Sequence, residues 1–368
     1  IRASYGEIGN QAVGSNMYIS TVSKRTDGNT HWLNGSNKVV AYDLPSLVSP
    51  TLKWERIQTL DIGGDFGFFN NELNISFDWY QRTTKDMLAP GQTMPDVLGA
   101  GAPKINAGTL RTRGWELSID WRHHFNEVNV YANASIGDFK TVITKWDNDS
   151  QLLNENYSGK VYGDIWGFET DRYFTKDDFN ADGSYKEGIA SQKKLEQDGF
   201  VYGPGDIKFK DLNNDKEING GEGTVKDHGD LKVIGNTTPR YQYGFRLGGE
   251  WKGIDIDMFF QGVGKCDAWT QSAFVMPMMR GADAIYANQA NYWTDENPDP
   301  NADFPRMWPG NAGKGTVSVL DLGNHNFYPQ SKYLVNMAYL RFKNLTIGYT
   351  LPKDWTRKVY MDKVRVYF

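Results

Sequence analysis

Hydrophobic and polar side chains alternate along residues 114–137, which read GWELSIDWRHHFNEVNVYANASIG. In the first half the apolar positions are Trp115, Leu117, Ile119 and Trp121. A polar pair, Asn126–Glu127, interrupts the pattern, and it then resumes at Val128, Val130, Ala132, Ala134 and Ile136. Alternation with period two on both sides of a short polar break predicts a β-hairpin with one apolar face and one polar face.

The same design recurs along the chain. Each further copy has two alternating segments around a turn: residues 52–88 with the turn at Asn70–Asn71, residues 240–262 with the turn at Lys252–Gly253, and the last pair, 339–352 with 363–368. In the last pair the apolar positions change parity between Phe342 and Leu345, so we expect a β-bulge near Asn344. The pattern therefore predicts an all-β, antiparallel protein.

The links between the predicted strands alternate in length. Short links lie around residues 70, 126 and 252 and at 352–361, whereas long links cover about 87–106, 147–240 and 268–332, with room for a short helix near Ser191–Gln197. The predicted strands have about ten residues or more, the length that a tilted strand needs to cross a bilayer, and their polar faces carry charges that suit a wet lumen. We therefore predict a transmembrane β-barrel segment with short periplasmic turns and long extracellular loops.

Composition and charge mainly exclude other classes. The 368 residues have a net charge of −5 and no long basic run, which argues against nucleic acid as a partner. Cys266 is the only cysteine, so neither an intrachain disulfide nor a thiolate cluster can form, and the five histidines lack metal-binding spacing. No apolar run approaches the ~18 residues of a transmembrane helix. We recognise no signal peptide, and the alternation is in progress at both ends, so we expect both ends to be cut from a longer chain.

Several segments together resemble the SusC/RagA group of TonB-dependent outer-membrane transporters. The segments that carry the resemblance are RASYGEIGNQ, WERIQTLDIGGDFGFFNNELNISFDWYQRTTKDML, INAGTLRTRGWELSIDW, GDIKFKDLNNDKEI, TPRYQYGFRLGGEWKGIDIDMFFQG and YLRFKNLTIGYTLP. They occur in order over nearly the whole chain. The resemblance implies that residues 1–368 are the C-terminal portion of a barrel of about 22 strands in the outer membrane, without the plug domain and the TonB box.

The resemblance also implies a function in Bacteroidetes-type nutrient uptake. A protein of this group imports oligosaccharides, or oligopeptides, as the SusC-like channel of a SusCD-type complex. Its partners would be a SusD-like surface lipoprotein and the TonB complex, which supplies the energy. No GxSxG motif, Cys–His arrangement or phosphate loop predicts an enzyme. The alternatives are a secreted, calcium-stabilised β-sandwich that binds or hydrolyses glycans, and a passive porin.

One acidic loop is a candidate metal site. Within DLNNDKEINGGE the candidate ligands are Asp211, Asn213, Asp215, Glu217 and Glu222, of which the first three and the last occupy positions 1, 3, 5 and 12 of a calcium loop. Lys216 stands where such a loop normally has glycine. The alternative is an Asx-rich turn whose side chains cap their own backbone. A second segment offers Asp178, Asn180 and Asp182 but has Ile189 at position 12, which favours a plain turn.

The long loops hold many aromatic residues, which pack against sugar rings and peptides. The candidates for substrate or partner contact are Trp166, Tyr173, Trp269, Trp293 and Trp308, together with Arg280. The alternative role for each residue is packing within the loop or against a partner. Residues 272–281, SAFVMPMMRG, are rich in methionine and suit either an adaptable partner contact or a loop core.

Overall fold

The computed structural model describes residues 1–10, 18–24, 33–34, 37–38, 42–91, 95, 97, 99, 101–197, 200–277, 285–308 and 325–368. The chain divides into two compact units. The first comprises residues 1–125, 131–149 and 156–161, and the second comprises residues 126–130, 150–155 and 162–368.

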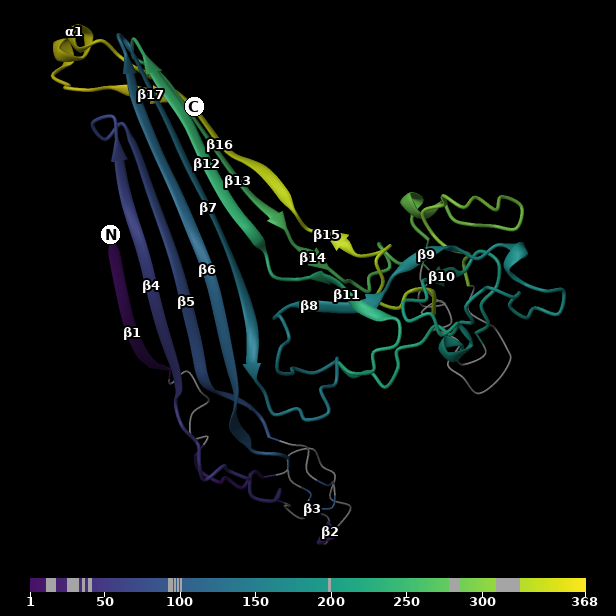
Figure 1. The fold of residues 1–368 in the computed structure, drawn as a ribbon. Coiled ribbons are helices and arrows are strands. Elements are labelled where there is room, and N and C mark those ends of the chain that lie inside the picture. Colours follow the sequence, from purple (N-terminus) through teal and green to yellow (C-terminus); the bar gives the residue numbers. More distant parts are fainter. Residues whose placement is uncertain are drawn as a thin grey trace. The chain divides into compact units, whose positions relative to one another are not determined.

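The first unit is built from long antiparallel strands that neighbour one another in the order β1-β4-β5-β6-β7 (Figure 1). Their bounds are β1 (Arg2–Asn10), β4 (Glu55–Phe68), β5 (Leu73–Pro90), β6 (Lys104–Phe125) and β7 (Val128–Lys145). Two short strands, β2 (Leu33–Asn34) and β3 (Asn37–Lys38), pair with each other. At the predicted turn between β4 and β5, Asn70 and Asn71 have φ values of 55° and 66°, a left-handed backbone that asparagine tolerates.

The register of these strands aligns their apolar positions into rows. Ile62 on β4 lies opposite Trp79 on β5, which lies opposite Trp115 on β6. Closer to the turn, Phe66 lies opposite Ile75. Ile62 and Phe66 are 45% and 50% exposed, and the other three are only partly buried. A contiguous apolar sheet face that is open in this way is what a transmembrane barrel presents to lipid.

The opposite face of the same strands carries ion pairs. Arg2 donates hydrogen bonds to Asp65 and to both carboxylate oxygens of Asp78, the latter at 2.6 and 2.7 Å. Gly63 lies opposite both Arg2 and Asp78, and a Cβ atom there would come within 1.9 Å of Asp78 Oδ1. The glycine thus gives room for a cross-strand charge pair, and charges on this face suit a water-filled lumen.

Three long strands of the second unit and the short β17 follow the order β12-β13-β16-β17. Their bounds are β12 (Arg240–Trp251), β13 (Ile254–Lys265), β16 (Tyr339–Thr350) and β17 (Arg365–Tyr367). The predicted turn at Lys252–Gly253 is confirmed, with φ values of 48° and 86°. Between β16 and β17 the chain forms α1 (Lys353–Thr356) and the 3₁₀ turn η6 (Arg357–Val359).

The predicted β-bulge is confirmed at Lys343 on β16. The pairing register with β13 shifts between Phe259 and Phe260, so Lys343 is an extra residue between Phe342 and Leu345. Because of this insertion, Phe342 and Leu345 lie on the same face of the sheet although their sequence separation is odd. They are 54% and 43% exposed. The bulge therefore preserves the apolar face through a change of sequence parity.

The structure changes two loop boundaries. Strands β5 and β6 continue to Pro90 and from Lys104, so the loop predicted at 87–106 is shorter than expected, because cross-strand pairing extends past the apolar band. The sequence pattern also did not identify the long link between β1 and β4, of which residues 18–24, 33–34, 37–38 and 42–54 are described. A short helix near Ser191–Gln197 is confirmed as η3 (Lys193–Leu195). Within the described ranges, the helices are too short to cross a membrane.

The links predicted at 147–240 and 268–332 join β7 to β12 and β13 to β16. We call the described residues of 162–239 and 266–338 the loop module. Its strands are β8 (Asp164–Phe168), β9 (Thr170–Tyr173), β10 (Ile207–Phe209), β11 (Leu231–Asn236), β14 (Asp267–Ala268) and β15 (Val335–Asn336), and its other short helices are η2 (Lys176–Asp178) and η4 (Ala287–Gln289). β8 pairs with β11, β9 with β10, and β14 with β15, all antiparallel.

Candidate functional site

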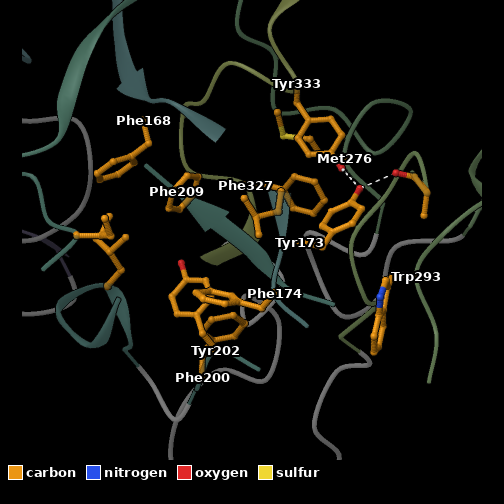
Figure 2. Close-up of a cluster of buried hydrophobic side chains, with 14 of the residues drawn as sticks. Phe168, Tyr173, Phe174, Phe200, Tyr202, Phe209, Met276, Trp293, Phe327 and Tyr333 are labelled. Carbon is orange, nitrogen blue, oxygen red and sulfur yellow. Dashed lines mark hydrogen bonds between the residues drawn. The ribbon is translucent and has the colours of Figure 1, made fainter. Parts of the chain in front are cut away.

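The loop module has a hydrophobic core of its own, built mostly from aromatic rings (Figure 2). Phe174, Phe200 and Phe209 are at most 1% exposed. Figure 2 shows Tyr173 pointing toward Tyr333. The Tyr173 hydroxyl donates to the Ala302 carbonyl oxygen at 2.8 Å. Burial raises the pKa of Tyr173 well above its ordinary value, so this hydroxyl keeps its proton. The core therefore fixes the two long links against each other.

A buried carboxylate holds three segments of the loop module together. Asp206 is fully buried and accepts a hydrogen bond from the Gly203 backbone N–H at 2.9 Å. It also accepts hydrogen bonds from Arg306, from the indole N–H of Trp308 at 2.8 Å and from the Asn326 amide at 2.8 Å. Because a buried charge needs such partners, Asp206 makes the positions of these segments interdependent.

An open pocket of about 510 Å³ lies on the loop module beside β9. Its walls come from three segments: Thr170, Asp171, Arg172 and Tyr173; Pro300 and Asn301; Ser331 and Lys332. The segments are held in place by hydrogen bonds between them. The Thr170 backbone N–H donates to Ser331 Oγ at 3.0 Å, and the Thr170 hydroxyl donates to Gln330 at 2.9 Å.

Two of the three charged residues of the pocket have ionic partners. Lys208 donates to Asp171 Oδ2 at 2.8 Å. Arg172 donates to both oxygens of Asp178, at 2.7 and 2.6 Å. Burial works against ionisation of Asp178, but the hydrogen bonds from Arg172 and Thr175 outweigh it and lower its pKa to about 2. Both carboxylates are therefore paired with cations.

Lys332 differs from these two residues. Its ammonium nitrogen lies 5.0 Å from the ring centre of Tyr173 and 5.8 Å from that of Tyr333, within cation–π range. It also lies 3.5 Å from the Ala302 carbonyl oxygen. In the described part of the chain, no carboxylate lies within ion-pair distance of this nitrogen. Although Lys332 as a residue is exposed, burial of its charged end lowers its pKa, and the negative charge of Asp303 nearby offsets part of this effect.

The structure separates the aromatic candidates by burial. Tyr173 and Trp293 are 3% and 4% exposed and belong to the loop core, although Tyr173 also forms part of the pocket wall. Trp269 packs partly buried against that core, and Trp166 on β8 lies 5.4 Å from His228. Trp308 is partly buried, with Arg306 over its ring at 4.5 Å. Arg280 lies outside the described residues.

The candidate calcium loop is organised by Asx turns. Asp211 accepts the backbone N–H groups of Asn214 and Lys216, at 2.6 and 2.9 Å. Asn213 and Asp215 each accept the N–H group two residues further on. Asn214 and Lys216 have positive φ values of 62° and 67°. Glu217 lies 2.7 Å from Lys194, and Glu222 is exposed. No metal-ligand cluster of acidic, histidine or cysteine residues occurs within the described ranges. The calcium ion stays a prediction.

A second, more open charge cluster joins three segments of the loop module. Glu169, between β8 and β9, accepts hydrogen bonds from Lys210 at 2.5 Å and from Lys232 on β11. These bonds, that from Lys210 foremost, lower the pKa of Glu169 to about 2. In the second candidate calcium segment, Asp182 accepts hydrogen bonds from the Ser184 backbone N–H and hydroxyl, as expected for a plain turn.

The sequence interpretation missed the pocket. Lys332, Ser331 and Asn301 were not among the candidates, because they lie in or next to a long irregular link without periodicity. Their approach to β9 depends on contacts between residues 129 and 160 positions apart. No local pattern around these residues could have revealed it.

The family model and the curated relatives that match this chain all belong to TonB-dependent receptors. The family model described as TonB dependent receptor-like, beta-barrel, matches residues 1–367. TonB-dependent receptor P3 of Formosa agariphila is 28% identical, over 100% of this chain and 34% of that receptor. TonB-dependent receptor SusC of Bacteroides thetaiotaomicron is 23% identical, over 86% of this chain and 28% of that receptor. The chain thus spans about a third of the length of the curated relatives it matches.

Solved structures give the same fold. The RagAB peptide transporter superposes with a TM-score of 0.66 at 21% identity, over 100% of this chain and 36% of that chain. The RagAB peptide importer in its open-open state gives a TM-score of 0.68 at 21% identity, over 99% of this chain and 35% of that chain. At this identity the likeness shows the fold alone.

Proposed function

Because the chain belongs to the TonB-dependent receptor-like β-barrel family, we propose that it is the wall and loop region of an outer-membrane importer that is energised through TonB. The predicted resemblance to the SusC/RagA group and the predicted transmembrane barrel fold are confirmed. A β-sandwich is wrong as the fold. The family relatives are receptors named for TonB dependence, which supports transport and gives no support to an enzyme.

The observation that carries this proposal is the two-faced sheet. Exposed apolar rows such as Ile62 and Phe66 lie on one face, and charge pairs such as Arg2 with Asp78 lie on the other. A soluble protein would bury such an apolar face, whereas a bilayer covers it. The polar face then lines a path for a hydrophilic cargo.

The proposed cargo is an oligosaccharide, and the proposed partners are a SusD-like surface lipoprotein and the TonB complex. The match to SusC supports this assignment. The RagAB neighbour is named a peptide transporter, so oligopeptides are the competing cargo. The aromatic and polar composition of the loop module suits either cargo, and an experiment has to separate them.

The experiment uses the full-length protein in its own bacterium. The gene is deleted and then restored, and uptake of fluorescent oligosaccharide and oligopeptide pools is measured with and without a protonophore. We expect deletion and protonophore each to abolish uptake of an oligosaccharide fraction, and a lipoprotein to co-purify with the tagged protein. Loss of peptide uptake alone would reject the sugar assignment, and uptake that survives the protonophore would reject energised import.

A further inference from the structure

The apolar face of the first unit ends in positive charge. Trp115 on β6 lies opposite Trp79 in the last row that is apolar on both β5 and β6. Arg113 and Arg111 occupy the next two positions of β6 on the same face, because residues of a strand alternate between faces. The short turns lie at the other end of these strands, so the two arginines lie toward the long links, at the extracellular end of the barrel wall.

Lys140 on β7 adds a third cation to this face. On the inward face, Thr112 Oγ1 lies 2.8 Å from Thr141 Oγ1. The next residues along the two strands, Arg113 and Lys140, therefore lie opposite each other on the outward face, where both are exposed. Cβ atoms in such a pair are about 4.5–5.5 Å apart, and like charges there repel each other. With Arg111 about 7 Å along β6, these residues form what we call the cation triangle.

The carboxylates of the same face do not neutralise the cation triangle. From the Trp115 row to the long links, strands β1, β4, β5, β6 and β7 place these charged side chains on this face: the cations Arg56, Lys85, Arg111, Arg113 and Lys140, and the carboxylates Glu7, Asp86 and Asp138. Glu7 and Asp86 lie 3.8 and 2.9 Å from Arg56, and Lys85 lies opposite Arg56, so these four charges cancel. Asp138, which is 8% exposed, offsets one charge of the triangle. Five cations less three carboxylates leave two positive charges, and both belong to the cation triangle.

The Arg113 side chain is oriented to donate to an anion on this face. Its Nε donates to Gln81 Oε1 at 2.7 Å, which holds the guanidinium and leaves both Nη groups for another acceptor. In the described part of the chain, no carboxylate lies within ion-pair distance of the three cations of the triangle. A phosphate group suits them, because two guanidinium groups and an ammonium can donate to its several oxygens at once.

We propose that the cation triangle binds the phosphate groups of lipid headgroups in the extracellular leaflet of the membrane. The lipid chains would cover the apolar rows that begin at Trp79 and Trp115, so the headgroup site continues the lipid-facing surface without a gap. This continuity favours a lipid over an acidic protein, which would cover the cations but not the adjoining apolar rows. The inference needs the barrel to stand in a membrane, and it is independent of the cargo and of energised import.

The test measures lipid binding to the full-length protein purified in a non-ionic detergent. Native mass spectrometry gives dissociation constants for two lipids with the same chains: dimyristoyl phosphatidic acid, and dimyristoyl phosphatidylcholine, whose phosphate is masked by a choline cation. Inorganic phosphate, added at constant ionic strength, is the competitor that separates a lipid headgroup from a free anion. Heat-modified gel mobility checks that each variant has a folded barrel.

The variants are Arg113→Gln, Arg113→Lys and a triple variant that combines Arg113→Gln with Arg111→Gln and Lys140→Gln. Arg82→Gln is the matched control. Arg82 is exposed on the same sheet but follows Gln81 directly on β5, so it lies on the opposite face. The single variants carry the comparison if the triple variant does not fold.

We expect phosphatidic acid to bind at least tenfold more tightly than phosphatidylcholine. One cation near a lipid surface contributes about fivefold in affinity, so Arg113→Gln should weaken phosphatidic acid binding about fivefold and the triple variant about 100-fold. Arg113→Lys keeps the charge and should retain most of the affinity, and Arg82→Gln should retain all of it. Equal affinity for the two lipids, equal effects of Arg113→Gln and Arg82→Gln, or displacement of the lipid by millimolar inorganic phosphate would each overturn the inference.

Two further results separate a lipid from a protein and this inference from the proposed function. Loss of a co-purifying acidic protein from the triple variant, with phosphatidic acid binding unchanged, would assign the triangle to a protein contact and overturn the inference. Lipid binding that is insensitive to the triple variant would overturn it while leaving import intact. Absence of cargo uptake by the unaltered protein would instead reject the proposed function, and the lipid measurements would stand unchanged.

Discussion

Replacing Asp206 with alanine should open the loop module without unfolding the barrel strands. The carboxylate is fully buried and accepts hydrogen bonds from Gly203, Arg306, Trp308 and Asn326. In the alanine variant the guanidinium loses its ionic partner, and the indole, amide and backbone N–H groups lose their acceptor. The three segments that meet at Asp206 then have no common anchor.

The expected magnitude follows from burial. Removing one partner of a buried ion pair costs about 3–5 kcal/mol. The Arg306 side chain is 32% exposed and can regain some hydration, so we take the lower end, about 3 kcal/mol. Since 1.4 kcal/mol corresponds to a tenfold change, the opening equilibrium of the module should shift about 100-fold. Asp206→Asn keeps the shape and one acceptor oxygen, so its effect should be smaller.

Hydrogen exchange read by mass spectrometry on the detergent-solubilised full-length protein measures this shift. Peptides covering residues 200–210 and 325–333 should exchange about 100-fold faster in Asp206→Ala, while a peptide covering 114–137 serves as the barrel reference. Asp182→Ala removes an exposed aspartate of the same module and is the matched control. Unchanged exchange in the module, or equal changes in both variants, would refute the anchoring role of Asp206.

Three further variants test other parts of the structure. The hydrogen bonds that lower the pKa of Glu169 to about 2 stabilise the module at pH values above about 4.5, the pKa of Glu169 in the unfolded chain, and this stabilisation is lost toward pH 2. The difference in unfolding free energy between wild type and Glu169→Gln, measured by fluorescence during denaturant unfolding, should therefore vanish as the pH falls from about 4.5 to about 2. A difference that stays constant over this range would contradict the prediction. Gly63→Ala should displace the Asp78 side chain and lower the folding stability by about 1–3 kcal/mol, seen as a lower melting temperature on semi-native gels. Gly6→Ala is the control, because a methyl group there meets open space, and equal melting temperatures of the two variants would disprove the steric explanation. Ile256→Arg should cost about 2–4 kcal/mol and reduce folding into lipid vesicles, while Ile256→Leu should not; equal folding yields would show that this face does not meet lipid.

The barrel strands could be predicted from the sequence because their geometry repeats locally. A strand places alternate residues on opposite faces, and a tight turn fixes which residues of the next strand lie opposite. The turns at Asn70–Asn71 and Lys252–Gly253 are therefore visible as interruptions, and the bulge at Lys343 is visible as a change of parity. The extension of β5 to Pro90 was missed, since the alternation is lost there: residues 81–86 are all polar and residues 87–90 are all apolar.

The loop module shows why the site could not be predicted in the same way. Its aromatic residues have no period, so nothing local distinguishes Trp293, which is buried in the core, from Trp308, which lies partly open at its edge. The same oxygen pattern at Asp211 serves both a cation loop and an Asx turn, because each needs acceptors at alternate positions. The cation–π contact between Lys332 and the Tyr173 ring joins residues far apart in the sequence, so no local pattern could reveal it. The loop module therefore depends on long-range contacts among irregular segments, whereas the barrel strands are specified one by one from local alternation.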